Sequence, residues 1–180
     1  MRYHNITHDD MLNGDGLRTV LWVSGCTHHC EECQNPITWD PDGGLLFDDA
    51  AKGEVFEQLD KSYISGLTLS GGDPLFIGNR VDVRSLCREV KEKYPHKTIW
   101  LYTGYLYEEI KDDAVLNYVD VLVDGEYIKE LRDEKLLWKG SGNQRVININ
   151  KTKESGEIVL HCGDYADGKV FKGKSCETNS

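Results

Sequence analysis

The chain has 180 residues, enough for one domain or for one domain with a short extension. An apolar fraction of 39% and a charged fraction of 29% are ordinary for a globular protein and exclude a collagen-like or wholly disordered chain. The 21 basic and 31 acidic side chains leave a net charge of −10, which argues against sequence-independent binding to DNA or to an anionic membrane. No apolar stretch approaches the roughly 20 residues that cross a bilayer, and the first residues do not resemble a signal peptide. We therefore expect a cytoplasmic protein with no nucleic-acid or membrane partner.

Strand and helix patterns alternate along most of the chain. Strands are predicted where β-branched and aromatic residues form short runs, at residues 17–23, 66–70, 98–102 and 119–123. Helices are predicted between them, from residue 48 or 49 to about 61, from about 81 to 94, and from about 106 to 118. This alternation predicts an α/β fold with a mainly parallel sheet. Because a complete eight-stranded barrel takes about 250 residues, we expect an open, partial TIM-like βα barrel.

The pattern weakens beyond about residue 138. A further strand is expected at residues 145–149, with 157–160 as its candidate partner. We divide the chain into a domain of residues 1–150 and an extension of residues 151–180, which contains one extra strand followed by a loosely ordered tail.

Small or polar residues follow each of the four predicted strands. The first strand leads to Cys26, the second to residues 71–73, the third to Thr103 and the fourth to Asp124. In parallel α/β folds, ligands bind outside the carboxyl ends of the strands. The sequence therefore predicts that the functional site lies at this edge of the sheet.

Cys26, Cys30 and Cys33 form a Cys-x3-Cys-x2-Cys loop directly after the first strand. In a reducing cytosol, clustered cysteines bind metals more often than they form disulfides. Thiolates suit iron–sulfur clusters, zinc or copper(I), and three of them would leave one iron of a four-iron cluster open to a substrate. The alternative is a structural zinc ion with His28, His29 or a distant residue as fourth ligand. The lack of a second cysteine pair favours the cluster, and we interpret the two histidines as solvated loop residues.

The cysteine loop resembles that of radical S-adenosylmethionine enzymes. The segments on either side of it, residues 13–18 and 34–39, resemble those of glycyl-radical activating enzymes. Four later segments narrow the resemblance to the branch that activates anaerobic ribonucleoside-triphosphate reductase: residues 69–75, 102–105, 122–125 and 138–145. The resemblance covers about residues 1–150.

The resemblance implies one 4Fe–4S cluster, held by Cys26, Cys30 and Cys33, and S-adenosylmethionine as the second cofactor. It implies that the reduced cluster cleaves S-adenosylmethionine to methionine and a 5′-deoxyadenosyl radical. That radical would generate the glycyl radical on the large subunit of anaerobic (class III) ribonucleoside-triphosphate reductase. The partners implied are this subunit and a low-potential, flavodoxin-like electron donor.

The resemblance also implies a set of S-adenosylmethionine contacts: Glu32, Cys33, Gln34, Gly71, Gly72, Asp73 and Thr103. Many members of the superfamily carry an aromatic residue before the third cysteine, where this chain has Glu32, so the backbone is the expected contact there. The methionine part is expected at residues 71–74, where two glycines permit close approach to the backbone and Asp73 adds a carboxylate. Taken alone, Gly-Gly-Asp-Pro is also good turn chemistry.

Two alternatives remain open. One is a radical enzyme of the same superfamily that acts on a small molecule, similar to a deazapurine synthase; residues 13–18 and 138–145 argue against it. The other is a non-catalytic zinc module that binds a partner.

The roles of several other residues are open. Thr103, Asp124 and Asn143 lie near strand ends and either belong to the site or cap turns. Arg18 is either a surface strand residue or a contact to a ligand or partner. Trp39 either shields the cluster or anchors its loop. Cys87 lies on the apolar face of its helix and is expected in the core, whereas Cys162 and Cys176 are interpreted as incidental.

Overall fold

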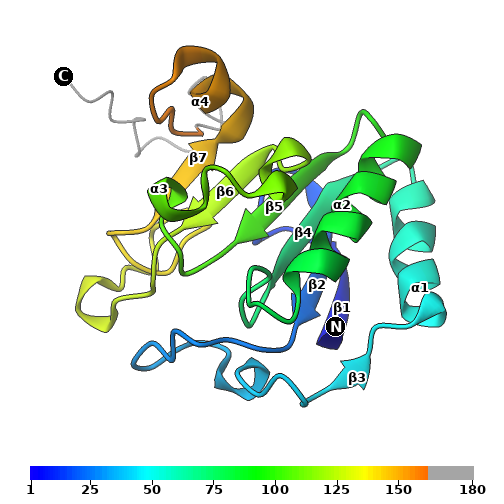
Figure 1. Ribbon diagram of the computed structural model, residues 1–180, viewed down its shortest axis with the longest axis horizontal. Helices are drawn as coiled ribbons and strands as arrows, with labels where there is room; N and C mark the ends of the chain where they lie inside the picture. Colours follow the sequence, from blue (N-terminus) through cyan, green and yellow to red (C-terminus); the bar gives the residue numbers. More distant parts are fainter. Residues whose placement is uncertain (162–180) are drawn as a thin grey trace.

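The computed structural model describes residues 1–161 (Figure 1). Its centre is one sheet with the strand order β3-β1-β2-β4-β5-β6-β7. The strands are β1 (Arg2–Asp10), β2 (Leu17–Val23), β3 (Leu45–Leu46), β4 (Ile64–Gly71), β5 (Thr98–Tyr102), β6 (Val121–Asp124) and β7 (Arg145–Asn148). The helices are α1 (Asp49–Asp60), α2 (Arg80–Lys93), α3 (Tyr107–Ile110) and α4 (Ile149–Ser155). Short 3-10 turns occupy Pro36–Thr38, Ala114–Asn117 and Lys129–Leu131.

The middle of the sheet is parallel and its edges are antiparallel. Strands β2, β4, β5 and β6 run in the same direction, whereas β1, β3 and β7 are antiparallel to their neighbours. Val23 at the end of β2 lies opposite Gly71 at the end of β4, so the carboxyl ends of the parallel strands share one edge. The α/β class and the parallel centre are confirmed. The sheet is open, because its outermost strands β3 and β7 do not pair, and a TIM-like barrel is not confirmed.

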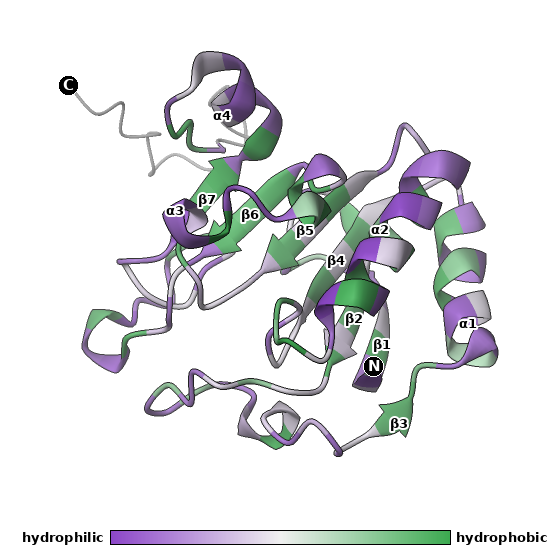
Figure 2. Ribbon diagram, viewed as in Figure 1, coloured by the Kyte–Doolittle hydropathy of each residue, from purple (hydrophilic) through white to green (hydrophobic). Residues whose placement is uncertain are grey.

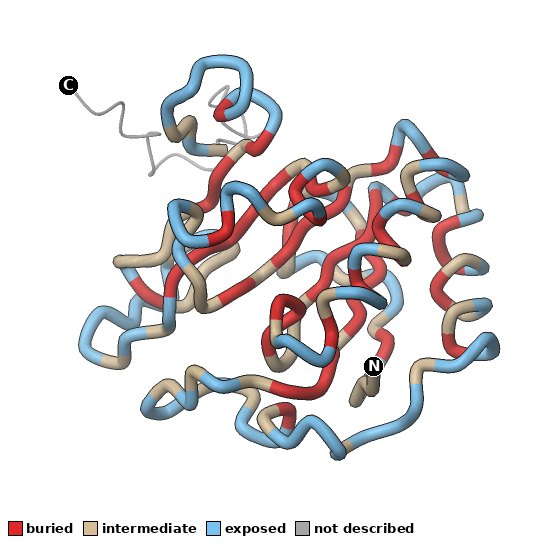
Figure 3. The backbone as a smooth tube through the Cα atoms, in the orientation of Figure 1, coloured by how far each residue is buried: buried red, intermediate tan, exposed pale blue. Residues whose placement is uncertain are grey.

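Helices α1 and α2 cover one face of the sheet (Figure 1). Val83, Leu86, Cys87 and Val90 of α2 point into the main core, and each is 2% exposed or less. Burying a side chain of this size contributes about 1.5–3 kcal/mol. Figure 2 shows the central strands as largely hydrophobic and α2 as mostly hydrophilic on its visible side, and Figure 3 shows the strands as mostly buried. Cys87 lies in this core as predicted, and burial raises the pKa of its thiol to about 12.

The opposite face of the sheet carries a smaller apolar cluster, whose buried members are Trp100, Val121, Val123 and Val146. Trp138 packs edge-to-face on Trp100 at 5.1 Å between ring centroids, and Tyr102 borders the cluster. This face is not covered by a helix layer in the described part of the chain. Loops lie over it instead, and residues 10–13 and 132–140 from these loops line a cavity.

Arg18 of β2 lies inside this second face. Its side chain is fully buried and donates hydrogen bonds to side-chain and carbonyl oxygens of Asp15, Leu67, Thr68 and Thr98. Its guanidinium carbon lies 5.4 Å from the centre of the Trp100 ring. Burial lowers the pKa of Arg18 to about 10. Of the two readings that the sequence left open for Arg18, the surface strand residue is contradicted by this burial, and within residues 1–161 its hydrogen bonds go to the sheet and to the loop before β2.

Most predicted elements are present, and the main exception follows β5. The helix predicted from about 106 to 118 is divided into α3 and the 3-10 turn Ala114–Asn117. The carboxylate of Asp113 accepts a hydrogen bond from the Val115 amide, which caps the second piece and separates it from the first.

Strands β1 and β3 and helix α4 were not predicted. Strand β1 alternates buried and exposed positions only weakly, and its pairing with β2 is visible only in three dimensions. Helix α4 begins at Ile149, where the expected strand and the expected domain boundary meet. The expected partner segment at 157–160 does not form a strand, but an isolated bridge joins Leu160 to Ile147, and the amide of Asn148 donates to the carbonyl of Val159. The tail after His161, with Cys162 and Cys176, lies outside the described residues.

Within residues 1–161, none of the helices has the length and apolar character that spanning a bilayer requires.

Candidate functional site

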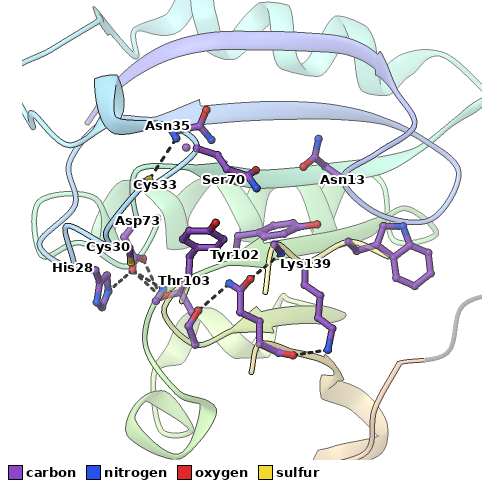
Figure 4. A pocket seen from close by; sticks show the side chains of 18 of the residues that line it. Asn13, His28, Cys30, Cys33, Asn35, Ser70, Asp73, Tyr102, Thr103 and Lys139 are labelled. Atoms are coloured by element: carbon purple, nitrogen blue, oxygen red, sulfur yellow. Dashed lines mark hydrogen bonds and ion pairs between the residues drawn. The ribbon is translucent and has the colours of Figure 1, made fainter. Parts of the chain in front are cut away.

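A cavity of about 750 Å³ opens at the carboxyl edge of the parallel strands (Figure 4). Its volume lies within the range of about 300–1,000 Å³ that is usual for small-molecule sites. Its wall contains most of the residues that the sequence singled out: Cys26, Cys30, Cys33, Gln34, Trp39, Gly71, Gly72, Asp73 and Thr103. The cavity thus lies at the edge of the sheet where the sequence predicts the site.

The cysteine loop is tied at its base to the segment that follows it. The amide of Gly25 donates to the carbonyl of Thr38 at 2.8 Å, and the amide of Cys26 donates to the carbonyl of Trp39 at 3.1 Å. The amide of Asn35 donates to the sulfur of Cys33 at 3.4 Å. The two ends of the loop therefore lie side by side, and its three thiols line the cavity.

The three thiols are chemically suited to an iron–sulfur cluster. All three are free and partly exposed, and soft thiolate sulfur is the usual ligand of such clusters. Burial raises the pKa values of Cys26 and Cys30. Among residues 1–161, no three histidine, cysteine or acidic side chains converge on a common metal-binding point. The fit of the donor set to a cluster therefore rests on the chemistry of its three free thiols and on the cavity wall that they share.

The Gly71–Gly72 turn touches the end of β2. A Cβ atom on Gly72 would lie 2.5 Å from the carbonyl oxygen of Gly25, and Gly71 has a φ of +108°, which disfavours any residue with a side chain. The amide of Gly72 donates to the carbonyl of Val23, and that of Asp73 to the carbonyl of Gly25. Glycine at both positions therefore lets the backbone of the turn lie against the base of the cysteine loop.

The carboxylate of Asp73 is 2% exposed and is held entirely by neighbouring groups of the protein. It accepts hydrogen bonds from the amides of Leu75 and Gly104 at 2.7 and 3.0 Å, and from the hydroxyl of Thr103 at 2.9 Å. Thr103 therefore lies in the cavity wall as a partner of Asp73. Together these contacts join the end of β4 to the end of β5.

His28 occupies a different position from the one predicted. Its side chain is only 11% exposed, with Nε2 2.8 Å from Asp73 and Nδ1 2.8 Å from Glu126 (Figure 4 shows the first contact). Hydrogen bonding to Asp73, and to a smaller extent to Glu126, raises the pKa of His28 to about 9. The interpretation of His28 as a solvated loop residue was wrong, because partners distant in the sequence surround it. His29 is exposed as predicted, and its ring lies 4.8 Å from that of Trp39.

Glu32 lies outside the cavity wall. Its exposed carboxylate pairs with Lys129 at 2.8 Å, next to the pair between Lys129 and Glu31 at 3.0 Å. Its neighbours Cys33 and Gln34 do line the cavity. These two pairs link the cysteine loop to the 3-10 turn after β6.

Two further candidates hold the fold together. Asp124 is fully buried, accepts a hydrogen bond from the amide of Tyr107 and pairs with Arg145. Asn143 accepts a hydrogen bond from Ser141 and donates one to the carbonyl of Glu126. Of the two readings that the sequence left open for these residues, the structure favours capping and turn formation.

The cavity also contains residues that the sequence analysis placed in family-like segments but not among the candidate site residues. Tyr102 and Trp138 line it, and within residues 1–161 the buried hydroxyl of Tyr102 has no hydrogen-bond partner. Gln144 lines it as well, and its side-chain amide donates to the carbonyl of Gly125 while its oxygen accepts from the amide of Gly140. Alternation along β5 places Tyr102 on the same face as Trp100, a signal that was available in the sequence.

Comparison with known proteins identifies a family for the chain. A family model described as a 4Fe-4S single cluster domain matches residues 12–147, which include the cysteine loop and the four parallel strands. This match, over more than half of the chain, places it among the proteins with a 4Fe-4S single cluster domain.

Full-length relatives define the family more closely. Three similar proteins are each named anaerobic ribonucleoside-triphosphate reductase-activating protein. The one from Enterobacteria phage T4 is 49% identical over 81% of this chain and 93% of its own length. Those from Haemophilus influenzae and Escherichia coli K12 are 43% and 39% identical, over 80% and 83% of this chain and 96% and 99% of their own lengths. The chain belongs to the family of anaerobic ribonucleoside-triphosphate reductase-activating proteins.

Proposed function

We propose that this protein is a radical S-adenosylmethionine activase that generates the glycyl radical of anaerobic ribonucleoside-triphosphate reductase. The observation that carries the proposal is that the three thiols of the cysteine loop and the Gly71–Gly72 turn line one cavity. The name shared by the relatives supports the reductase as target. The open sheet would then be a reduced form of the TIM-like barrel that the family resemblance implies.

Each part of the cavity has a role in this proposal. Cys26, Cys30 and Cys33 would hold the cluster through three of its irons. The cofactor's methionine part would lie against the backbone of Gly71 and Gly72, where the absence of side chains leaves space. Asp73 and Thr103 would keep that turn in place through the hydrogen bonds that they share.

The remaining proposed contacts to S-adenosylmethionine lie at the end of the cysteine loop. The backbone at Glu32, Cys33 and Gln34 would contact the nucleoside part, although the side chain of Glu32 points to Lys129. A bound, reduced cluster would supply the electron for cleavage of S-adenosylmethionine to methionine and a 5′-deoxyadenosyl radical, and that radical would take a hydrogen atom from a glycine of the reductase. Trp39 and Trp138 line the cavity, and their apolar rings would exclude water from the site of that radical.

The remaining parts of the proposal concern partners and organisation. A low-potential, flavodoxin-like protein in the cytoplasm would supply the electron, and the large subunit of the reductase would supply the glycine. Residues 1–150 would carry the activity, with residues 151–180 as an extension.

The test is anaerobic reconstitution with iron and sulfide, followed by reduction and addition of S-adenosylmethionine. We expect 5′-deoxyadenosine to form, and a glycyl radical to appear by electron paramagnetic resonance once the reductase subunit is added. A fully loaded protein that forms no 5′-deoxyadenosine would refute the radical chemistry. Formation of 5′-deoxyadenosine without a glycyl radical on the reductase would instead indicate a small-molecule substrate.

Replacement of Cys30 tests the ligand assignment. Because Cys30→Ala removes one of three thiols, we expect loss of the iron–sulfur absorbance and of 5′-deoxyadenosine formation, with an unchanged far-ultraviolet circular dichroism spectrum. The matched control is Cys87→Ala, which removes a thiol from the core and should leave the iron content unchanged. Full iron loading of the Cys30 variant would show that the ligands are misassigned.

A further inference from the structure

His28 connects the cysteine loop to the ends of three parallel strands. It lies between Cys26 and Cys30 in the sequence, yet Nε2 contacts Asp73 after β4 and Nδ1 contacts Glu126 after β6, both at 2.8 Å. Its ring packs edge-to-face on Tyr105, which follows β5, at 4.8 Å between centroids. Through these three contacts, one side chain of the loop reaches the ends of β4, β5 and β6.

The local backbone is shaped to receive this ring. A Cβ atom on Gly104 would lie 2.5–2.7 Å from atoms of the His28 imidazole, closer than real Cβ atoms approach other heavy atoms. Glycine at position 104 therefore leaves the space that the ring fills. The amide of Gly104 also donates to the same carboxylate oxygen of Asp73 that faces His28. The imidazole thus belongs to a packed arrangement and not to a freely moving loop.

The two partners of His28 differ in how firmly they are held. Asp73 is 2% exposed and has other hydrogen bonds that fix its orientation, whereas Glu126 is 55% exposed. Because Asp73 is itself fixed, the contact to Asp73 is the one that can fix the position of His28, and with it the cysteine loop, relative to β4. Asp73 directly follows Gly72, so this contact joins the thiol wall of the cavity to the glycine wall.

We propose that His28 is a positioning residue that locks the cysteine loop against the Gly71–Asp73 turn and so sets the spacing between the cluster and S-adenosylmethionine. This inference rests on the proposed function for the identity of the two groups. The lock itself concerns only residues of this chain. It assigns no ligand role to His28, because both ring nitrogens face carboxylates.

Three substitutions separate the two contacts. In His28→Gln the side-chain amide reaches the position of Nε2 and keeps the contact to Asp73. In His28→Asn the shorter amide reaches the position of Nδ1 and keeps only the contact to Glu126. His28→Ala removes both. The matched control is His8→Gln, because His8 is an exposed histidine that lies 2.8 Å from Glu54 and away from the cavity.

The first measurement uses the protein without its cluster. Hydrogen–deuterium exchange of residues 26–33 should be faster in the alanine and asparagine variants than in wild type, and close to wild type in the glutamine variant. The second measurement uses the reconstituted protein. Iron content should be unchanged in all variants, while the dissociation constant for S-adenosylmethionine should rise at least tenfold for alanine and asparagine, equivalent to about 1.4 kcal/mol.

The outcomes are distinct. Rescue of both properties by glutamine, but not by asparagine, supports the lock. Wild-type exchange and affinity in His28→Ala would overturn it, as would equal losses in the glutamine and alanine variants. Loss of iron in His28→Ala would also overturn it, because His28 would then act on the cluster directly. Failure of the radical chemistry would leave the exchange result unaffected, so the two proposals fail separately.

Discussion

At position 18 a charged side chain occupies the interior of the sheet. Arg18 is completely buried, and its planar guanidinium reaches oxygens on two neighbouring strands and on the loop that precedes β2. A guanidinium can do this because it carries five donors in a rigid fork, which lysine cannot reproduce. Residues 13–18 are part of the family resemblance, and the structure shows that Arg18 joins the loop before β2 to strands β4 and β5.

Arg18→Met should therefore destabilise the protein strongly. The carbonyl oxygens of Leu67 and Thr98 and the hydroxyl of Thr68 would lose buried donors, at a cost of about 3 kcal/mol or more. Urea unfolding of the cluster-free protein measures this, with Arg18→Lys expected to restore little. The control is Arg88→Met, because Arg88 is 54% exposed. Equal unfolding free energies for Arg18→Met and wild type would contradict the assignment.

At the scale of single elements, the edge strand β7 is anchored by one arginine. Arg145 contacts both carboxylate oxygens of Glu108 on α3, at 2.7 and 3.0 Å, and also pairs with Asp124 at the end of β6. The hydrogen bonds to Arg145 lower the pKa of Glu108 to about 2, and both carboxylates raise the pKa of Arg145. This strand at the edge of the sheet is thereby tied to a helix as well.

The depressed pKa makes this anchor dependent on pH. A carboxyl group whose pKa is lower in the folded state stabilises the protein above its unfolded value of about 4.3, and this contribution is lost as the pH falls toward 2. Glu108→Gln should thus lower the free energy of unfolding at pH 7 by less than about 1 kcal/mol, because the pair is partly exposed. The difference from wild type should shrink between pH 4.5 and pH 3 in urea titrations.

Glu92→Gln is the control for that series, because Glu92 is an exposed carboxylate 3.9 Å from Arg88. It should unfold like wild type at pH 7. A Glu108→Gln difference that stays constant from pH 7 to pH 3 would show that the carboxylate contributes by something other than its charge.

At the scale of the whole molecule, residues from both ends of the described chain meet on the face of the sheet without helices. Nε2 of His161 lies 2.5 Å from Asp15, and the ring lies 5.1 Å from Trp100 and 5.7 Å from Trp138. The amide of His161 also donates to the carbonyl of Val146 on β7. These contacts bridge the β7 side of the open sheet and the loop before β2. His161 lies beyond residue 147, where the family match ends.

His161→Ala should therefore loosen the loop at residues 11–16. We expect faster hydrogen–deuterium exchange there and a changed tryptophan fluorescence, because the imidazole would no longer contact the two indole rings. His96→Ala, at an exposed position, should change neither property. Unaltered exchange at residues 11–16 in the His161 variant would show that other contacts, such as those of Asp10 and Arg18, are enough to hold the loop.

Patterns over short stretches were enough to locate most elements and the edge that carries the cavity. Helical spacing identifies α1 and α2, and small or polar residues after each parallel strand indicate where the ligand edge lies, because both signals depend on neighbours in the sequence. The helix after β5 was predicted as one piece because the spacing of apolar residues does not reveal the cap that Asp113 forms inside it. Strand β1 was missed because its own sequence pattern is weak and its pairing with β2 forms only in the tertiary structure.

What the sequence determined by itself was the α/β class, the order of the central elements, the cysteine loop and the family that its motifs resemble. What only the tertiary structure decided was the partners of single side chains: Arg18 turned inward, and His28 paired with Asp73 across 45 positions. The openness of the sheet was decided there too, because it depends on whether β3 and β7 meet. The physical reason is that secondary structure follows local periodicity, whereas burial and hydrogen bonding of a polar side chain depend on groups that folding brings in from distant parts of the chain.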